Sequence, residues 1–181
     1  VGTRLGMAIC FDENDARVVG RTARGVKALT LGEGDEVIGM SVCRPGGLLM
    51  TVTETGYGRL SELTDYRVQS RGGKGLTNYH TEEFGNVAAI KVVDENDDVI
   101  LISSDGIIIR MAASEVRQCR RPSKGVRLMR LEEDARIVSL VRMPHEEPDE
   151  AEGAHAQSPA QEDTPRDAQT AGEPQQQDRP E

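Results

Sequence analysis

Three short loops combine cationic side chains with glycine, and they recur along the chain at a spacing of 50 residues. Each contains an arginine, a second basic residue three positions later and a glycine directly after that residue. Arginine and lysine neutralise phosphate, and glycine lets main-chain amides approach an anion closely, so the loops indicate phosphate binding. Together with two basic residues beside these loops, the candidate phosphate-binding cations are Arg21, Arg24, Lys27, Arg71, Lys74, Arg120, Arg121 and Lys124.

Acidic residues lie in other segments, which allows the charge to be segregated on the surface. They gather at 33–36, 82–83, 94–98 and 132–134. A domain whose faces differ in charge carries a basic stripe even when its net charge is zero. The alternative interpretation is that the loop cations are solubilising turn residues that happen to repeat.

A second short element, an acidic residue followed two positions later by arginine, recurs at the same spacing. It reads Asp15-Ala16-Arg17, then Asp65-Tyr66-Arg67, then Glu115-Val116-Arg117. We interpret this element as structural, either an ion pair or a turn cap in every repeat.

The sequence gives little indication of a metal site, a disulfide framework or a catalytic site. The three histidines, of which two lie near the C-terminus, form no cluster, so we expect neither a metal site nor histidine-based catalysis. The three cysteines are widely spaced and odd in number, which argues against a disulfide framework or a zinc clasp and favours a reducing compartment. No nucleotide-hydrolase phosphate loop or nucleophile elbow occurs, and no apolar run is long enough to span a membrane. We therefore predict no catalytic residue in this chain.

The elements that hold the loops form an internal repeat. Residues 1–143 contain nearly three copies of one 50-residue unit, the first lacking its opening segment, and no insertion breaks the register. We place the repeats at about 1–45, 46–95 and 96–143. Because equivalent loops of a repeat array fall at equivalent positions, the cations are expected to follow one curved edge.

Each repeat has the pattern of β-strands. Apolar segments of four to eight residues, rich in β-branched side chains, alternate with turn signals such as Arg44-Pro45-Gly46-Gly47 and Asp94–Asp98. No long helical period is present, although Ala112–Val116 could form one turn. Roughly four strands per repeat is typical of propeller blades, and three blades cannot close a ring, so we expect part of a longer protein. The predicted strands are 7–11, 26–31, 36–42, 48–53, 87–93, 99–103, 106–111, 126–131 and 136–141.

The C-terminal segment has a different composition. Pro144–Glu181 carries 11 acidic and 2 basic residues, which leaves 20 of each sign in 1–143. It contains no Val, Ile, Leu, Met, Phe, Tyr or Cys, so it cannot bury enough apolar surface to offset the entropy lost on folding. We predict a disordered acidic tail at 144–181 that competes with phosphate for the cations.

Three segments resemble the C-terminal domain of the A subunit of bacterial DNA gyrase. They are Gln69–Gly75, Thr53–Arg59 and Gly32–Gly39, and the units match in order from Val1 to about Met143. The signature box of that family reads Gln-Arg-Arg-Gly-Gly-basic-Gly and lies in the first blade. Gln69–Gly75 is a near copy with Ser70 in place of an arginine, in the penultimate blade, so we treat it as an echo of the box within a repeat.

The resemblance implies an all-β fold, a propeller-like β-pinwheel of four-stranded antiparallel blades, with the last three blades in this chain. It implies that the domain binds and wraps double-stranded DNA at its basic rim as part of an ATP-dependent type II topoisomerase, an isomerase that introduces negative supercoils. ATP and Mg would serve the holoenzyme, an A2B2 assembly with the gyrase B subunit, in the cytoplasm on the chromosome. The catalytic tyrosine of the family belongs to a cleavage domain that this sequence does not contain.

Two alternatives remain from the residues. One is the related C-terminal domain of the topoisomerase IV A subunit, and the other is a propeller-like protein-interaction scaffold. If the loop cations contact DNA phosphates, changing Arg71 and Lys74 to Ala should flatten the salt dependence of binding by up to roughly 1.8 in slope. As loop residues they should each affect stability by no more than about 0.5 kcal/mol.

Overall fold

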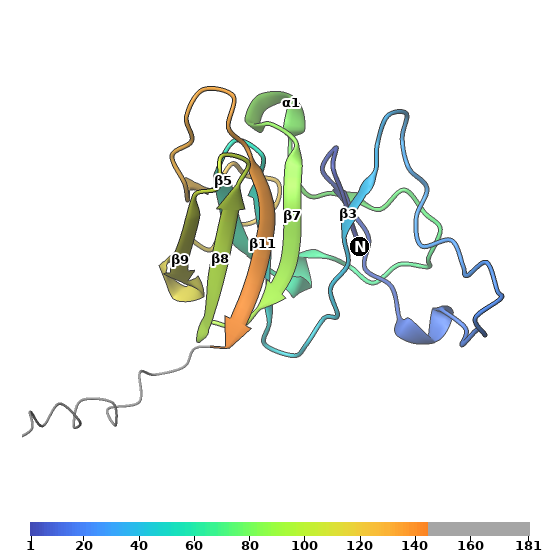
Figure 1. The fold of residues 1–181 in the computed structure, drawn as a ribbon. Helices are drawn as coiled ribbons and strands as arrows, with labels where there is room; N and C mark the ends of the chain where they lie inside the picture. The colour runs from blue at the N-terminus through green and yellow to red at the C-terminus, as the bar shows by residue number, and fades with distance from the viewer. Residues whose placement is uncertain (145–181) are drawn as a thin grey trace, which may run out of the picture. The chain divides into compact units, whose positions relative to one another are not determined.

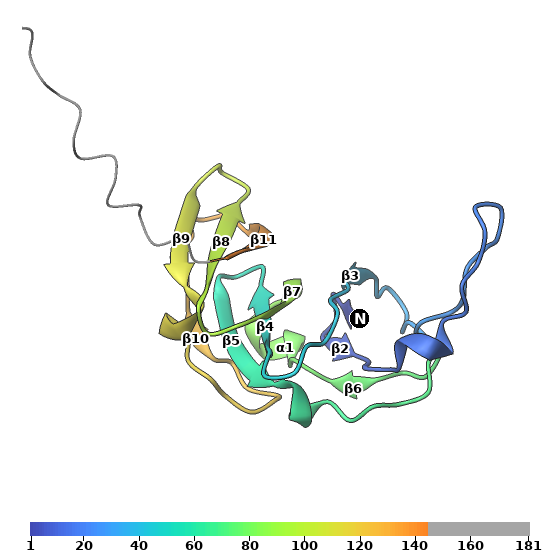
Figure 2. The same ribbon diagram turned by 90° about the horizontal axis from the view of Figure 1, so that it is seen from below.

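The computed structural model describes residues 1–144, and residues 145–181, which hold almost all of the predicted acidic tail, lie outside the described residues. The described part consists of antiparallel β-sheets, as the sequence predicts (Figures 1 and 2). Its helical segments are short: α1 (Thr81–Phe84) and three 3₁₀ turns at 13–15, 63–65 and 113–115. The last of these turns lies within the segment for which one helical turn was expected.

The first sheet has the strand order β3-β1-β2-β6. Its strands are β1 (Gly2–Thr3), β2 (Met7–Ala8), β3 (Val37–Gly39) and β6 (Leu76–Thr77). All four are two or three residues long, because the segments between them run as irregular loops.

The second sheet has the order β10-β5-β4-β7. Its strands are β4 (Leu48–Thr53), β5 (Tyr57–Glu62), β7 (Val87–Val93) and β10 (Val126–Arg127). Every residue of β4 is buried, because this strand has neighbours on both edges and packed sheets on both faces.

The third sheet has the order β11-β8-β9. Its strands are β8 (Asp97–Ser103), β9 (Ile108–Ala112) and β11 (Ile137–Pro144). Strand β11 pairs with β8 as far as Pro144, so regular structure extends one residue into the segment predicted to be disordered.

Each of the first two sheets takes its outer strand from the following repeat. Strand β6 lies in the second repeat but pairs with β2, and β10 lies in the third repeat but pairs with β5. The equivalent residues of the first repeat, Val26 and Lys27, belong to no strand in the described part of the chain. The prediction of a strand over 26–31 is therefore wrong, because no preceding hairpin among residues 1–144 is available to pair with it.

The core forms two clusters, and most of their buried residues are aliphatic. One cluster joins the second and third sheets around Met50, Val52 and Leu101, which are completely buried. The other joins the first and second sheets around Tyr79, Val87 and Ile90.

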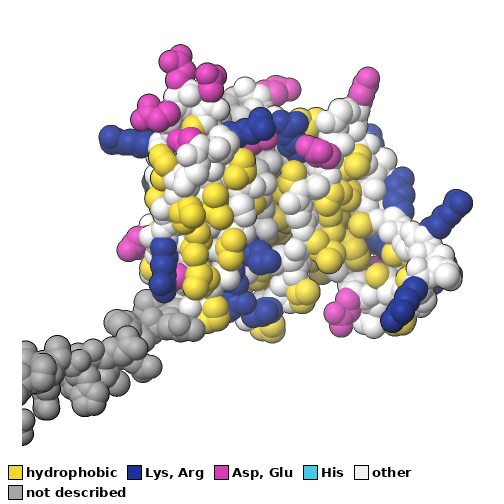
Figure 3. Space-filling model, in the orientation of Figure 1, with side chains coloured by type: hydrophobic (Ala, Val, Ile, Leu, Met, Phe, Trp, Pro, Cys, Tyr) yellow, Lys and Arg dark blue, Asp and Glu magenta, His cyan; other side chains and the backbone are white. Residues whose placement is uncertain are grey.

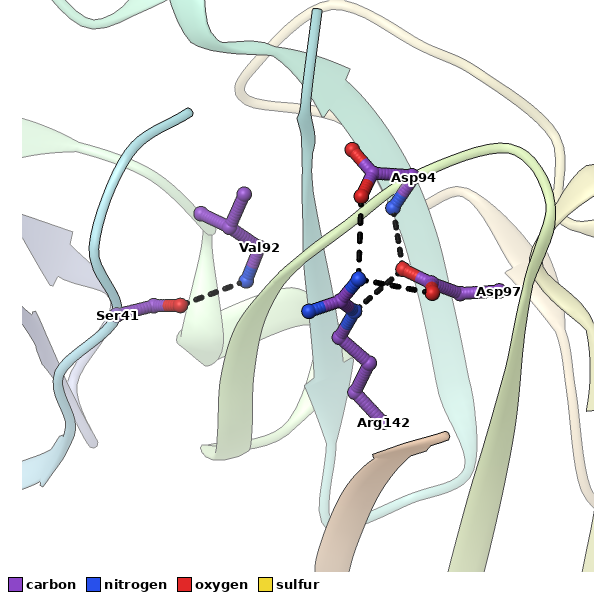
Figure 4. Close-up of polar contacts among 5 residues, drawn as sticks. All are labelled: Ser41, Val92, Asp94, Asp97 and Arg142. Atoms are coloured by element: carbon purple, nitrogen blue, oxygen red, sulfur yellow. Dashed lines mark hydrogen bonds and ion pairs between the residues drawn. The ribbon is translucent and has the colours of Figure 1, made fainter. Parts of the chain in front are cut away.

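The segment Asp94–Asp98 is not the exposed acidic turn that the sequence suggested. Asp97 and Asp98 are buried at the start of β8. Arg142 of β11 donates from Nε to Asp97 Oδ2 at 2.5 Å and from Nη2 to Asp94 Oδ2 at 3.1 Å (Figure 4). Arg110 of β9 bonds Asp98, with Nε at 2.8 Å from Oδ2. These acids neutralise arginines of neighbouring strands, so they do not form a free acidic patch.

Candidate nucleic-acid interface

Arg71 links the basic loop of the second repeat to the first repeat. Its Nε donates to the carbonyl oxygen of Asp15 at 2.8 Å, and its Nη1 donates to the carbonyl oxygen of Lys27 at 3.0 Å. The side chain is fixed by these bonds and is half-buried. Arg71 is thus a clamp between repeats as well as a cation.

Arg121 makes the equivalent contacts one repeat later. Its Nε donates to the carbonyl oxygen of Asp65 at 2.7 Å and its Nη1 to that of Thr77 at 3.1 Å. Its guanidinium carbon also lies 5.7 Å from the ring centroid of Tyr66. The basic loops of the second and third repeats therefore contact the preceding repeat in the same way, which gives these two loops equivalent positions on successive sheets.

The glycines that end the loops of the second and third repeats serve this packing. Gly75 and Gly125 have φ of +80° and +73°, and a Cβ there would lie 2.4 Å and 2.1 Å from the carbonyl oxygens of Ala8 and Gly58. Only glycine allows this backbone conformation together with so close an approach. The glycines are thus explained by contact between repeats, whereas the sequence suggested contact with an anion.

Lys124 and Arg127 lie against one aromatic side chain, Tyr57. The Nζ of Lys124 is 4.0 Å from the Tyr57 ring centroid and 5.5 Å from that of Phe84. The guanidinium carbon of Arg127 is 5.2 Å from the Tyr57 centroid, and its Nη2 donates to the phenol oxygen at 2.7 Å. This hydrogen bond lowers the pKa of the Tyr57 phenol below its ordinary value. Two cations are therefore held in place at this loop by one ring.

Arg127 is a candidate that the sequence reasoning missed. It is exposed, and it occupies the position equivalent to Lys27, which was predicted. The spacing of 50 could have identified it, but Thr77 occupies this position in the second repeat and interrupts the pattern.

The remaining predicted cations have free side chains within residues 1–144. No hydrogen bond or ion pair joins them to another described side chain, although the carbonyl of Lys27 accepts from Arg71. Figure 3 shows several Lys and Arg side chains projecting from the side of the molecule that carries the loops drawn in blue in Figure 1. Exposed cations without internal partners can neutralise an external anion. They are Arg21, Arg24, Lys27, Lys74 and Arg120.

The recurring acidic–arginine element forms turns. Its acid is the last residue of each 3₁₀ turn, Asp15, Asp65 or Glu115. Between residues 1 and 144, no ion pair joins this acid to the arginine that follows it, so the ion-pair alternative is wrong there. Instead, the main-chain carbonyls of Asp15 and Asp65 accept the clamps from Arg71 and Arg121.

Other kinds of site are weakly supported in the described residues. No group of three or more His, Cys, Asp or Glu side chains among them could hold a metal ion. None of their helices is long and apolar enough to cross a membrane. A cavity of about 440 Å³ between the first two sheets has a mainly apolar lining that includes Ile9, Leu49 and Ile90. Two thiols at its edge, Cys10 and Cys43, lie with their sulfurs 3.9 Å apart.

Comparison with known proteins agrees with this geometry. The family described as "DNA gyrase C-terminal domain, beta-propeller" matches residues 1–44, 47–94 and 97–142. The DNA gyrase A subunit of Staphylococcus aureus (strain MRSA252) is 42% identical over 166 residues, which are 90% of this chain and 18% of that protein.

Solved structures share the fold. A DNA gyrase A C-terminal domain superposes with a TM-score of 0.73 at 26% identity, covering 78% of this chain and 49% of that one. A C-terminal domain of DNA topoisomerase IV has the same TM-score at 24% identity, covering 78% of this chain and 45% of that one.

Repeated antiparallel sheets that share strands and carry basic loops define a propeller-like repeat domain. More particularly, the chain belongs to the DNA gyrase C-terminal domain family. The predicted all-β propeller-like fold and the resemblance are thus confirmed. The chain spans 18% of the length of the gyrase A relative. The repeat boundaries remain a prediction, as do the individual DNA-binding residues.

Proposed function

We propose that this chain binds and wraps double-stranded DNA as the C-terminal part of a DNA gyrase A subunit. In that role it supports ATP-dependent negative supercoiling by the complete enzyme. The observation that carries the proposal is the set of exposed cations, free of internal partners, in loops that occupy equivalent positions on successive repeats. Such a row suits the regularly spaced phosphates of a duplex.

The division of labour follows from the residues that are present. The described residues offer a binding surface, and we assign no catalytic residue to this chain. DNA cleavage is carried out by another part of the gyrase A polypeptide. ATP and Mg are used by an A2B2 assembly that includes the gyrase B subunit. We place this assembly on the chromosome in the cytoplasm.

Gyrase is favoured over topoisomerase IV by the comparisons. The gyrase A relative is 42% identical over 90% of this chain. The topoisomerase IV structure, at 24% identity, supports the shared fold alone.

The proposal is tested by removing two exposed lysines from equivalent loops, Lys74 and Lys124. The double change to Ala in the 181-residue chain should weaken duplex binding. It should also flatten the slope of log affinity against log salt by up to roughly 1.8, since each lost phosphate contact contributes about 0.9. Fluorescence anisotropy with a labelled duplex over a salt series gives both quantities. Duplexes of different sequence should bind alike, because phosphate contacts carry no sequence information.

The matched control removes two positive charges outside the loops, Lys91 of β7 and the exposed Arg136. It changes the net charge equally and should leave the salt slope nearly unchanged. If the loop variant and the control have the same slope as the unmodified chain, the loops do not bind DNA. A protein-interaction scaffold would then be the better explanation of the repeats.

A further inference from the structure

Besides its apolar clusters, the second repeat has a polar core at positions where the neighbouring repeats carry apolar side chains. Thr53 is buried as well, but its equivalents Thr3 and Ser103 also carry hydroxyls. The polar core consists of six other buried side chains with hydroxyl, amide or guanidinium groups: Thr51, Arg59, Ser61, Tyr66, Asn78 and Tyr79. The residues 50 positions earlier are Val1, Ile9, Phe11, Ala16, Ala28 and Leu29. The residues 50 positions later are Leu101, Ile109, Met111, Val116, Leu128 and Met129. The fold therefore accepts hydrophobic side chains at all six positions, so the polar set is not required to build a blade.

Arg59 is the centre of this set and is completely buried. Its Nη1 donates to Ser61 Oγ at 2.7 Å, and its Nη2 donates to Asn78 Oδ1 at 3.1 Å and to the Asn78 carbonyl. Its guanidinium carbon lies 5.2 Å from the Tyr79 ring centroid. None of the ion pairs within residues 1–144 includes Arg59. Burying a cation without a carboxylate is costly, so these dipoles must compensate it.

The network ends on the main chain of one basic loop. Arg59 Nε donates to the Ser123 carbonyl at 3.1 Å, Ser61 Oγ donates to the Cys119 carbonyl at 2.8 Å, and the Tyr79 hydroxyl donates to the Lys124 carbonyl. Burial raises the pKa of Tyr79 to about 12, which keeps this donor protonated. Three side chains of the second repeat thus hold the backbone on either side of Lys124.

The loop of the second repeat lacks this support. Besides the Arg71 clamp, it is held by bonds such as those from Thr30 Oγ1 to the Gly72 carbonyl at 2.7 Å and from Thr30 N to the Gly73 carbonyl at 2.8 Å. The residues equivalent to Arg59 and Tyr79 are Ile9 and Leu29, which have no side-chain donor. The two loops therefore have similar composition but different attachment.

We propose that the polar core of the second repeat fixes the loop 119–125, so that Lys124 meets a DNA phosphate in one set geometry. Arg59 is the positioning residue, acting through the Ser123 and Lys124 backbone without touching DNA. The proposal rests on the proposed function for its DNA part, while the ordering of the loop stands independently of it. Because Lys124 is also held against Tyr57, the cation loses little freedom when it binds.

Loop order is measured by ¹⁵N relaxation on the 181-residue chain. The amides of Ser123, Lys124 and Gly125 should have order parameters near those of rigid backbone, about 0.85. Isoleucine is the residue at the equivalent positions 9 and 109. In the Arg59→Ile variant, the order parameters of these three amides should fall toward about 0.6 or below. Gly72, Gly73 and Lys74 are the internal control and should not change. If both loops change together, or neither changes, Arg59 does not position this loop.

The link to DNA is measured by a double-mutant cycle of Arg59→Ile and Lys124→Ala. If Arg59 acts through Lys124, each single change should flatten the salt slope by up to about 0.9 and the double change by no more than that. Additive flattening would overturn the proposal. Arg59→Lys retains the charge but not the fork of donors, so it should behave like Arg59→Ile. If Arg59→Lys keeps the salt slope of the unmodified chain, only the charge of residue 59 matters. That result would also overturn the proposal.

Tyr79→Phe is a milder variant in case the arginine changes prevent folding. It removes only the hydroxyl that bonds the Lys124 carbonyl. It should loosen residues 123–125 and leave 72–74 unchanged, and an unaltered loop would contradict the proposal. Loosening of the loop without any effect of Lys124→Ala on DNA affinity would instead count against the proposed function of this loop.

Discussion

Two arginines of the basic loops, Arg71 and Arg121, each have a structural role as well as a charge. Arg71 and Arg121 have Nε and Nη1 committed to carbonyl oxygens of the preceding repeat, while the charge of each remains at the loop. The lysines three residues later make no such side-chain hydrogen bonds within the described chain. Changes to arginine and to lysine at these loops should therefore have separable effects on stability and on DNA binding.

Removing an arginine clamp should destabilise the fold more than the sequence alone suggested. Arg121→Ala leaves the carbonyls of Asp65 and Thr77 without this donor, so the free energy of unfolding should fall by about 1–3 kcal/mol. Urea denaturation measures the change. Arg21→Ala is the matched control, because no such bond from Arg21 occurs in the described part, and it should cost no more than about 0.5 kcal/mol. Equal losses for the two variants would show that the clamp contributes nothing.

The sequence predicted which residues carry the charge but not how they are used. A spacing of 50 residues revealed the loop cations without any coordinates. The clamps could not be predicted, because their acceptors are main-chain carbonyls that no residue type encodes. The position of Lys124 over Tyr57 likewise depends on the pairing of β10 with β5, which joins segments about 70 residues apart.

At the scale of elements, strand prediction succeeded where the buried face is aliphatic. Leu48–Thr53 and Val87–Val93 were predicted with the bounds that the structure has. Strand β5 was missed because its buried residues include Gly58, Arg59 and Ser61, which do not resemble a core pattern. Comparison with 7–12 and 107–112 would have identified it, since both contain strands at the equivalent position.

The last sheet depends on an ion pair between β11 and the start of β8. Burial acts to raise the pKa of Asp97, but the hydrogen bonds from Arg142 and from the Asp94 amide outweigh burial and hold this pKa below its ordinary value. A carboxyl with a lowered folded-state pKa adds stability above its unfolded pKa. That stability is lost as pH falls through the folded value.

Replacing Arg142 by Met should therefore cost most near neutral pH. The free energy of unfolding should drop by about 1–3 kcal/mol there, because Asp97 stays buried without its cation. The difference from the unmodified chain should shrink below about pH 4, where the carboxyl takes up a proton. Denaturation at a series of pH values measures this. Arg136→Met, at an exposed arginine, is the control, and a loss independent of pH would contradict the ion-pair explanation.

For the whole molecule, the charge is divided between two parts of the sequence. Residues 1–143 carry equal numbers of acidic and basic residues, and all of the net charge of −9 lies beyond them. An acidic segment on the same chain can compete with phosphate for the loop cations.

Deleting residues 145–181 should therefore tighten duplex binding at low salt. The difference between the truncated and full chains should vanish as salt screens both charges. Anisotropy titrations of the two chains in parallel measure it. Equal affinities at low salt would refute competition by this segment, whatever the loops themselves do.

The sharing of strands between sheets has a consequence for how the chain folds as it is made. The hairpin of β1 and β2 is synthesised well before its outer strand β6, and its sheet is complete only when Leu76 and Thr77 have left the ribosome. The second sheet must wait in the same way for Val126 and Arg127. Since synthesis adds roughly 5–20 residues per second, each sheet has an open edge for several seconds while its last strand is still being translated. Folding of this chain therefore follows translation with a lag set by the distance between a hairpin and its closing strand.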